Sequence, residues 1–327
     1  MRGNAQGFHE SRLRVSQNSS LPQSAVGGSY AGPLSFLRCP YTRDLQGVDL
    51  AVLGIPYDLA TTNRPGARFG PRAVREQSAF VGEYPWGVWP WEFDLRERFR
   101  VVDCGDVDFN VGYPERMIEA VEQAAGRILD AGVSLLGLGG DHFVSYPLLR
   151  AQAARHGPLS LLHLDAHSDT WASEDYNHGT MFYHAAKEGI IDAAHSIQIG
   201  IRTPNPDTHG LTIVDARELL DQGPRAVAER VRSVVGGRPA YLTLDIDFLD
   251  PAYAPGTGTP VIGGPTTHQA RELLLGLRGL NVVGGDQVEV APAYDALGQI
   301  TALAGATLAA DILYLIGLAR AERGAVT

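Results

Sequence analysis

The amino-acid sequence predicts an α/β fold: a three-layer α/β/α domain with helices on both faces of a central, mostly parallel sheet. Short apolar runs without polar alternation recur along the chain and indicate strands that are buried on both faces. Segments with helical periodicity lie between these runs, which is the pattern of crossover connections in parallel sheets. The 327 residues are 44% hydrophobic and 20% charged, an ordinary balance for a globular protein with a sizeable core.

The expected strands and helices alternate along most of the chain. The strands are expected at Val48–Ile55, Arg100–Asp103, Val133–Leu138, Leu159–Leu164, Ser196–Ile201, Thr212–Val214, Ala240–Leu244 and Val282–Val290. The helices are expected at Glu115–Ala131, Pro147–Arg155, Pro224–Val235, Thr266–Leu277 and Ile300–Arg323. No internal repeat or low-complexity linker interrupts this pattern, so residues 36–327 are predicted to form a single domain. Residues 1–35 lack periodicity and are predicted to form an irregular N-terminal arm.

Composition argues against several classes of protein. The formal net charge of -10 argues against a nucleic-acid binder and mildly favours cationic ligands. Cys39 and Cys104 are the two cysteines, too few for a disulfide framework or a thiolate zinc cluster. Residues 1–20 are polar and lack the apolar core of a secretory signal. The apolar run Thr301–Ala319 is interrupted by Asp311, which predicts a buried helix and not a membrane span. We therefore expect a cytoplasmic protein with no membrane partner.

Unusual polar residues gather at four of the expected strands. Ligands of parallel sheets bind beyond the carboxyl ends of the strands, so residues at these ends are candidates for a functional site. Residues two apart in an extended segment point the same way, which lets Asp165, His167 and Asp169 face one site. The same spacing relates two acids of a second strand. The candidates are Asp141, His142, Asp165, His167, Asp169, Asp245, Asp247, Asp286 and Glu289.

Taken singly, each of these acids is most simply a turn residue or a helix N-cap. Taken together, four aspartates and two histidines at neighbouring strand ends would repel one another strongly without cations. Carboxylates with a minority of imidazoles suit Mn²⁺ better than a structural zinc site. Four aspartates are too many for one ion and suit two, about 3.5–4 Å apart, which can generate hydroxide at neutral pH. The candidate metal ligands are His142, Asp165, His167, Asp169, Asp245 and Asp247.

These motifs resemble those of a known enzyme family. Gly139–His142, Asp165–Asp169 and Asp245–Pro251 look like the three signatures of the ureohydrolase (arginase and agmatinase) family. The resemblance covers roughly residues 35–322 and implies a mostly parallel sheet of about eight strands between helices. It also implies assembly as a homo-oligomer, a trimer or a hexamer. Further segments that are similar to bacterial agmatinases in particular are Gly66–Pro71, His178–Phe182, Ala254–Pro260 and Val288–Asp295.

The resemblance assigns a role to each metal ligand. It implies that one Mn²⁺ is held by His142, Asp165, Asp169 and Asp245. The other is then held by Asp165, His167, Asp245 and Asp247, so that Asp165 and Asp245 bridge the two ions.

Three residues are predicted to act on the substrate. His178 could simply cap a helix, but beside a metal cluster a proton shuttle is the better interpretation, and the family places one there. Glu289, costly inside an apolar strand, is predicted to grip a planar guanidinium in bidentate fashion, unless it merely supports the site. Asp169 would pass a proton from the nucleophile to the leaving amine. Asp286 is expected to orient a ligand or cap a turn, and His163 to be a satisfied core or supporting histidine.

The predicted activity is hydrolysis of agmatine to urea and putrescine, a step of polyamine metabolism. Residues 170–177, which precede the predicted catalytic histidine, contain Glu174 and Asp175 but no Arg or Lys, which favours a substrate with a terminal ammonium. The two acids could also be merely solvated, with a screened influence on the substrate. One alternative is a related enzyme acting on guanidinobutyrate or another guanidino acid. Another is a catalytically silent binding or regulatory member of the fold, which loss of metal ligands would indicate.

Overall fold

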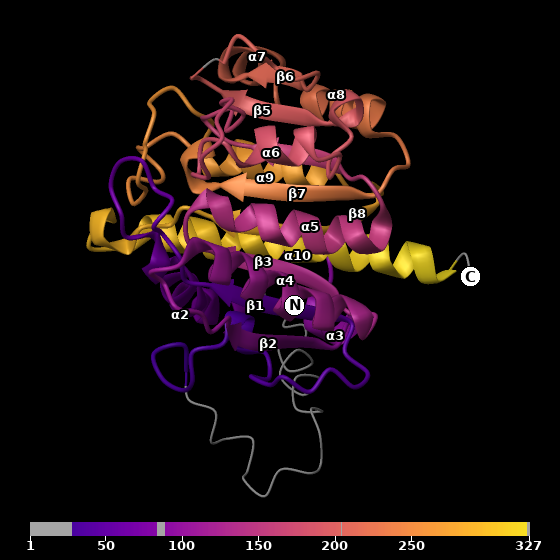
Figure 1. The fold of residues 1–327 in the computed structure, drawn as a ribbon. Coiled ribbons are helices and arrows are strands. Elements are labelled where there is room, and N and C mark those ends of the chain that lie inside the picture. Colours follow the sequence, from indigo (N-terminus) through magenta and orange to yellow (C-terminus); the bar gives the residue numbers. More distant parts are fainter. Residues whose placement is uncertain (1–27, 84–88, 204, 326–327) are drawn as a thin grey trace, which may run out of the picture. The chain divides into compact units, whose positions relative to one another are not determined.

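Eight parallel strands form one sheet within the part of the chain that the structure, a computed structural model, describes: residues 28–83, 89–203 and 205–325 (Figure 1). The strand order is β2-β1-β3-β8-β7-β4-β5-β6. The bounds are β1 Leu50–Ile55, β2 Val101–Asp106, β3 Ser134–Gly139, β4 Ser160–Leu164, β5 Ile197–Ile201, β6 Thr212–Asp215, β7 Ala240–Asp245 and β8 Val282–Val288. Every neighbouring pair of strands is parallel. The predicted sheet is therefore confirmed, and it is entirely parallel where a mostly parallel sheet was expected.

The continuous apolar runs of the sequence are explained by burial on both faces. Every residue of β1, β3, β4, β5, β7 and β8 is buried. Successive side chains of a strand point to opposite faces, so neighbours such as Leu135 and Leu136 enter two different cores. A sheet with one solvated face would have required polar residues at every second position.

Helices cover the two faces of the sheet (Figure 1). The core on one face includes side chains of α4, α5 and α6, and the core on the other face includes side chains of α2, α7, α8, α9 and α10. The α-helices are α2 Gly70–Glu83, α3 Leu95–Arg98, α4 Pro114–Asp130, α5 Ser145–His156, α6 Met181–Lys187, α7 Ala216–Gln222, α8 Pro224–Val235, α9 Thr267–Gly276 and α10 Ile300–Ala325. Short 3-10 helices lie at η3 Phe36–Arg38, η4 Ala67–Phe69, η6 His142–Val144, η7 Ala193–His195, η8 Ile246–Phe248 and η9 Pro292–Tyr294.

Helices α2, α3 and α7 were not expected from the sequence. The buried side of α2 includes Arg75 and Ser78 as well as apolar residues, so its hydrophobic periodicity is broken. Arg75 is tolerated there because its guanidinium pairs with Asp103 of β2, 2.8 Å away. Helix α7 begins directly after β6, where Asp215 caps it by accepting a hydrogen bond from the Glu218 N–H. A helix this short leaves little periodic pattern to detect.

Helix α10 is long and apolar enough to cross a membrane, but 83% of its most apolar window is buried inside the protein. Asp311 in this helix is only 2% exposed. Its carboxylate accepts hydrogen bonds from Trp91 Nε1 at 2.6 Å and from Arg271 Nε at 2.7 Å. The expectation of a buried helix is therefore confirmed.

The chain divides into two units, Leu34–Thr327 and Met1–Pro33. The first unit contains all the strands and helices named above. Of the second unit the structure describes residues 28–33, which contain a turn. Most of the predicted N-terminal arm, residues 1–35, lies outside the described residues.

The strand order places the polar strand ends side by side. The four central neighbours β3, β8, β7 and β4 are the strands that contain the candidate residues or end shortly before them. In the register, Asp245 at the end of β7 pairs with Val288, the residue before Glu289. A parallel sheet brings the carboxyl ends of its strands to one edge, so a single site can draw on all four.

The ion pair between α2 and β2 provides a test of the fold. Asp103 is fully buried, pairs with Arg75 and accepts the Phe36 N–H at 2.7 Å. Asp103→Ala leaves Arg75 buried without its main partner, so we expect the free energy of unfolding to fall by roughly 3–5 kcal/mol. Urea denaturation measures the free energy of unfolding of both proteins. The control Glu174→Ala removes an exposed partner of Lys187 and should change stability by less than about 1 kcal/mol; equal losses in the two variants would contradict the assignment.

Candidate metal centre

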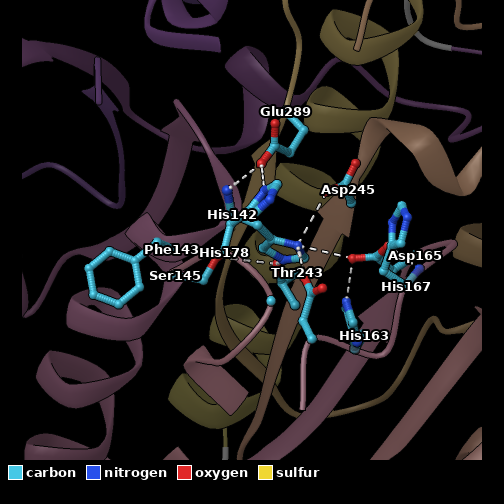
Figure 2. A network of polar contacts seen from close by, with 12 residues as sticks. His142, Phe143, Ser145, His163, Asp165, His167, His178, Thr243, Asp245 and Glu289 are labelled. Carbon is cyan, nitrogen blue, oxygen red and sulfur yellow. Dashed lines mark hydrogen bonds and ion pairs between the residues drawn. The ribbon is translucent and has the colours of Figure 1, made fainter. Parts of the chain in front are cut away.

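The first half of the site is built around His142. Strand β3 ends in a tight turn at Gly140, where a β-carbon would lie 1.8 Å from the carbonyl oxygen of Tyr57, so only glycine fits. Asp141 then caps η6 and presents His142 beyond the strand end. His142 Nδ1 lies 3.0 Å from an oxygen of Asp165, 3.0 Å from Asp169 and 3.3 Å from Asp245 (Figure 2).

The second half of the site shares Asp165 with the first. His167 Nδ1 lies 3.4 Å from Asp165 Oδ1 and 3.1 Å from Asp247 Oδ2. Ligand atoms of these three residues lie within 4.8 Å of one another, a spacing that could hold an ion. Because Asp165 turns Oδ2 toward His142 and Oδ1 toward His167, its carboxylate spans the two groups.

The electrostatics of both groups call for positive charge. Nδ1 of His142 is buried and has no hydrogen-bond partner, although carboxylates surround it. Burial lowers the pKa of His167, but Asp165 and Asp247 outweigh burial and raise that pKa to about 12. Burial and the charges of Asp247 and Asp165 raise the pKa of Asp245 well above its ordinary value. A pair of divalent cations would satisfy the open imidazole nitrogen and relieve the crowding of carboxylates, so the donor set fits metal binding.

Asp245 differs from Asp165 in how its two oxygens are used. Its Oδ2 faces His142, whereas its Oδ1 accepts a hydrogen bond from the Asp247 N–H at 2.8 Å. This bond caps η8 and fixes the position of Asp247. The geometry therefore places Asp165 between both groups and Asp245 beside the His142 group.

The sequence predicted an extended backbone around the candidate acids, but the structure is not extended throughout. Asp169 has φ of 50° and Glu289 has φ of 63°, both in the left-handed region that non-glycine residues rarely adopt. Strand β8 ends at Val288, so Glu289 lies just past the strand and not inside it. Both left-handed residues follow the point where the chain leaves the sheet, and such a conformation persists only where the surrounding structure fixes it.

Glu289 and His178 are brought together beside the candidate ligands. Glu289 is 1% exposed, and its Oε1 accepts the His142 N–H at 2.9 Å and contacts His178 Nδ1 at 2.8 Å (Figure 2). Its Oε2 is buried and has no hydrogen-bond partner. Because Oε1 already takes part in two contacts, Oε2 is the oxygen of Glu289 free to accept a further hydrogen bond, whereas the predicted bidentate grip on a guanidinium would use both oxygens.

His178 connects this buried carboxylate to the protein surface. Its Nε2 lies 2.7 Å from the hydroxyl of Thr62, an exposed residue, and accepts the Thr62 N–H at 3.0 Å. Burial lowers the pKa of His178, but Glu289 outweighs burial and raises that pKa to about 9. An Nε2 that accepts the Thr62 N–H belongs to a neutral ring, whereas Glu289, in contact with Nδ1, favours a second proton on the ring, so Thr62 and Glu289 act in opposite directions on the charge of His178.

His163 supports Asp165 from below. Gln198 Nε2 lies 2.8 Å from His163 Nδ1, and His163 Nε2 lies 2.7 Å from Asp165 Oδ2. An amide nitrogen can only donate, so Nδ1 accepts and Nε2 donates its proton to Asp165. His163 lies near enough to count among the possible ligands, but this hydrogen bonding matches the expected supporting role better.

The sequence analysis missed two hydroxyl residues of the site. Thr243 Oγ1 lies 2.8 Å from Nε2 of His142, and Thr62 contacts His178. Thr243 had a detectable signal, because it precedes Asp245 by two residues in one strand and so faces the same side. Thr62 had none, since 116 residues separate it from His178.

The loop that precedes His178 is less acidic in effect than its sequence suggests. Lys187 Nζ of α6 lies 3.5 Å from Glu174, so one of the two loop acids has a cationic neighbour. Arg64, two residues after Thr62, donates from Nε to the Gly258 carbonyl at 3.2 Å and from Nη2 to the Thr257 carbonyl at 2.8 Å. Local charge is thus a weaker guide to the substrate than the sequence implied.

Comparison with known proteins places the chain in a family. The model of the arginase family matches residues 48–314. The agmatinase of Serratia proteamaculans is 48% identical over 306 residues, which cover 93% of this chain and 97% of the relative. Among solved structures, a hypothetical agmatinase from Burkholderia thailandensis is 51% identical with a TM-score of 0.87, covering 92% of this chain and 94% of that one.

A second solved structure with a similar fold is an enzyme with another name. The proclavaminate amidino hydrolase of Streptomyces clavuligerus is 38% identical with a TM-score of 0.83, covering 90% of this chain and all of the other, 100%. The relative and the two solved structures each match this chain over at least 90% of its length. The chain therefore belongs to the arginase family of ureohydrolases and is an enzyme of the agmatinase type.

Proposed function

We propose that this enzyme hydrolyses agmatine to urea and putrescine at a pair of Mn²⁺ ions. The observation that carries the proposal is the convergence of the six candidate ligands on one edge of the sheet, with the unpartnered Oε2 of Glu289 beside them. Relatives about half identical to this chain over nearly their whole lengths bear the name agmatinase, which supports the choice of substrate.

The first ion would be held by His142, Asp165, Asp169 and Asp245, and the second by Asp165, His167, Asp245 and Asp247. Bridging by Asp165 is supported by the division of its oxygens between the two groups. Bridging by Asp245 would require its Oδ1 to share the Asp247 N–H hydrogen bond with an ion. Bound there, two divalent ions supply Lewis acidity and a hydroxide nucleophile at neutral pH.

The chain's own residues would then position the guanidinium and move protons. Glu289 Oε2 fixes the guanidinium plane by a charge-assisted hydrogen bond. Asp169 accepts a proton from the nucleophile and passes it to the departing nitrogen. The bond between the guanidino carbon and the alkyl-bearing nitrogen breaks, the nucleophile's oxygen stays on the carbon as urea, and the amine leaves. His178 exchanges protons with solvent past Thr62, which accounts for its contact with an exposed hydroxyl.

We further infer a cytoplasmic homo-oligomer, a trimer or a hexamer, with residues 36–327 as the catalytic domain. A guanidino acid such as guanidinobutyrate is the competing substrate. Arg64 beside Gly258 is the observation that favours it, although two backbone carbonyls already occupy this guanidinium. A catalytically silent role is not supported, because all six candidate ligands are present and lie together.

Removal of a shared ligand tests the metal centre. We expect chelation to abolish urea release and added Mn²⁺ to restore it. Asp245→Ala should lose essentially all turnover, because Asp245 is proposed to serve both ions. Urea release and bound manganese are measured together. The exposed Glu229, replaced by Ala as a control, should leave both unchanged; near-normal turnover in Asp245→Ala would show that the two-ion assignment is wrong.

Glu289 and His178 are tested by separating kinetics from metal content. Glu289→Gln keeps the shape but removes the charge that pairs with the guanidinium, so it should raise KM and lower kcat with manganese still bound. His178→Ala should mainly lower kcat. Loss of manganese from either variant would mean that a ligand had been mistaken for a catalytic group.

The substrate is tested with a panel of guanidino compounds. We expect kcat/KM for agmatine to exceed that for arginine and for 4-guanidinobutyrate by at least roughly tenfold, about 1.4 kcal/mol of differential transition-state binding. Urea release with Mn²⁺ present measures all three compounds. A preference for 4-guanidinobutyrate would leave the mechanism intact and change the substrate.

A further inference from the structure

A fully buried carboxylate in the centre of the sheet has no role in the proposed mechanism. Asp286 lies in the middle of β8, paired with Thr243 of β7 on one side and with Gly137 of β3 on the other. A β-carbon on Gly137 would lie 2.7 Å from Cδ1 of Leu148 and 3.1 Å from the β-carbon of Asp286, so the strands are tightly packed beside the acid. No Arg or Lys of the described residues forms an ion pair with Asp286. Such a charge is costly to bury unless another group uses it.

A chain of hydrogen bonds leads from Asp286 to His142. Tyr241 Oη donates to Asp286 Oδ2 at 2.7 Å, and Thr243 Oγ1 donates to Asp286 Oδ1 at 2.5 Å. His142 Nε2 lies 2.8 Å from the same Thr243 oxygen (Figure 2). All four residues are buried to within 1% of their surface. No water is needed to complete the connection, because each step is a direct contact.

Counting hydrogens fixes the direction of this chain. A threonine hydroxyl has one hydrogen, and here the hydrogen goes to the carboxylate. Thr243 Oγ1 must then accept from His142, so Nε2 carries the imidazole hydrogen. The other nitrogen, Nδ1, is left with a free lone pair. This is the buried atom without a hydrogen-bond partner that faces Asp165, Asp169 and Asp245.

We propose that Asp286 is a positioning residue of the metal centre, which acts through Thr243 to hold His142 in the tautomer that directs the Nδ1 lone pair at the ion. The inference rests on the proposed metal centre and adds to it a residue outside the ligand set. A carboxylate that receives the second hydrogen of a ligating imidazole orients the ring and raises its basicity as a ligand. Here a threonine hydroxyl stands between the two groups.

The charge of Asp286 decides the direction. A neutral group able to donate to Thr243 would reverse the chain, so that Thr243 donated to Nε2 and Nδ1 carried a hydrogen pointing at the ion. Burial raises the pKa of Asp286 above its ordinary value, although His142 and the hydroxyls of Thr243, Tyr241 and Ser145 act in the opposite direction. The O–H that Thr243 donates to Oδ1 at 2.5 Å favours the ionised carboxylate without help from Tyr241.

The test compares variants along the chain by their affinity for Mn²⁺ alone. The full-length protein is freed of metal by dialysis against a chelator, and the two dissociation constants are measured by competition with a coloured chelator. Thr243→Val removes the hydroxyl at nearly constant volume, and Thr243→Ser restores it. Asp286→Asn keeps the shape of the acid but lets it donate. Tyr241→Phe is the matched control, because it also removes a hydroxyl from Asp286 but leaves the link to His142 intact.

We expect Thr243→Val and Asp286→Asn to weaken one of the two Mn²⁺ sites by roughly ten- to a hundredfold and to leave the other within about threefold. Thr243→Ser and Tyr241→Phe should both stay within about threefold of the wild type at both sites. Rescue by serine separates an effect of the hydroxyl from an effect of packing. Thr243→Ala serves as the hydroxyl-free variant should valine prevent folding, which circular dichroism checks.

Three outcomes would overturn the inference. A folded hydroxyl-free variant with wild-type affinity at both sites would do so, and so would an equal loss in Tyr241→Phe. In both cases the wild type still binds two ions, so the proposed metal centre survives. A wild-type protein that binds no Mn²⁺ would overturn the proposed function and this inference together.

Discussion

The crowding of buried negative charge at the carboxyl edge of the sheet is the constraint on which the site depends. Asp165, Asp245 and Asp247 are nearly or fully buried within reach of one another, and a buried carboxylate is unstable unless positive charge or hydrogen bonds compensate it. Each of the three accepts at least one backbone N–H, but these bonds leave the charges uncompensated. The two imidazoles and the two cations that they would help to bind complete the balance.

The fold meets this constraint by making four neighbouring strands end at one level. A parallel sheet with β3, β8, β7 and β4 adjacent delivers ligands from distant parts of the sequence to one edge. Three local devices lead the chain away from the strand ends: a glycine turn at Gly140, a 3-10 helix capped by Asp245, and left-handed residues at Asp169 and Glu289. Rigid strands thus set the distances, and the turns set the directions of the side chains.

Support of the site continues beneath the candidate ligands. His163 and Gln198 hold Asp165, while Thr243 and Asp286 hold His142. Both chains consist of buried polar groups that hydrogen-bond one another, which keeps the ligand atoms in place. On the open side, His167 and the segment at Thr62 connect the site to solvent.

The sequence by itself determined the class of fold, the strands and most helices. Strands buried on both faces appear as continuous apolar runs, and the longer helices appear as segments with helical periodicity. The sequence also grouped the candidate ligands, since strand ends carry their acids in recurring short motifs. Only the tertiary structure decided what depends on contacts between distant segments: helix α2, whose buried Arg75 is satisfied by Asp103; the placement of Glu289 past its strand; and the contact of Thr62 with His178. No local pattern encodes these features, because each partner is supplied by a part of the chain that lies far away in sequence.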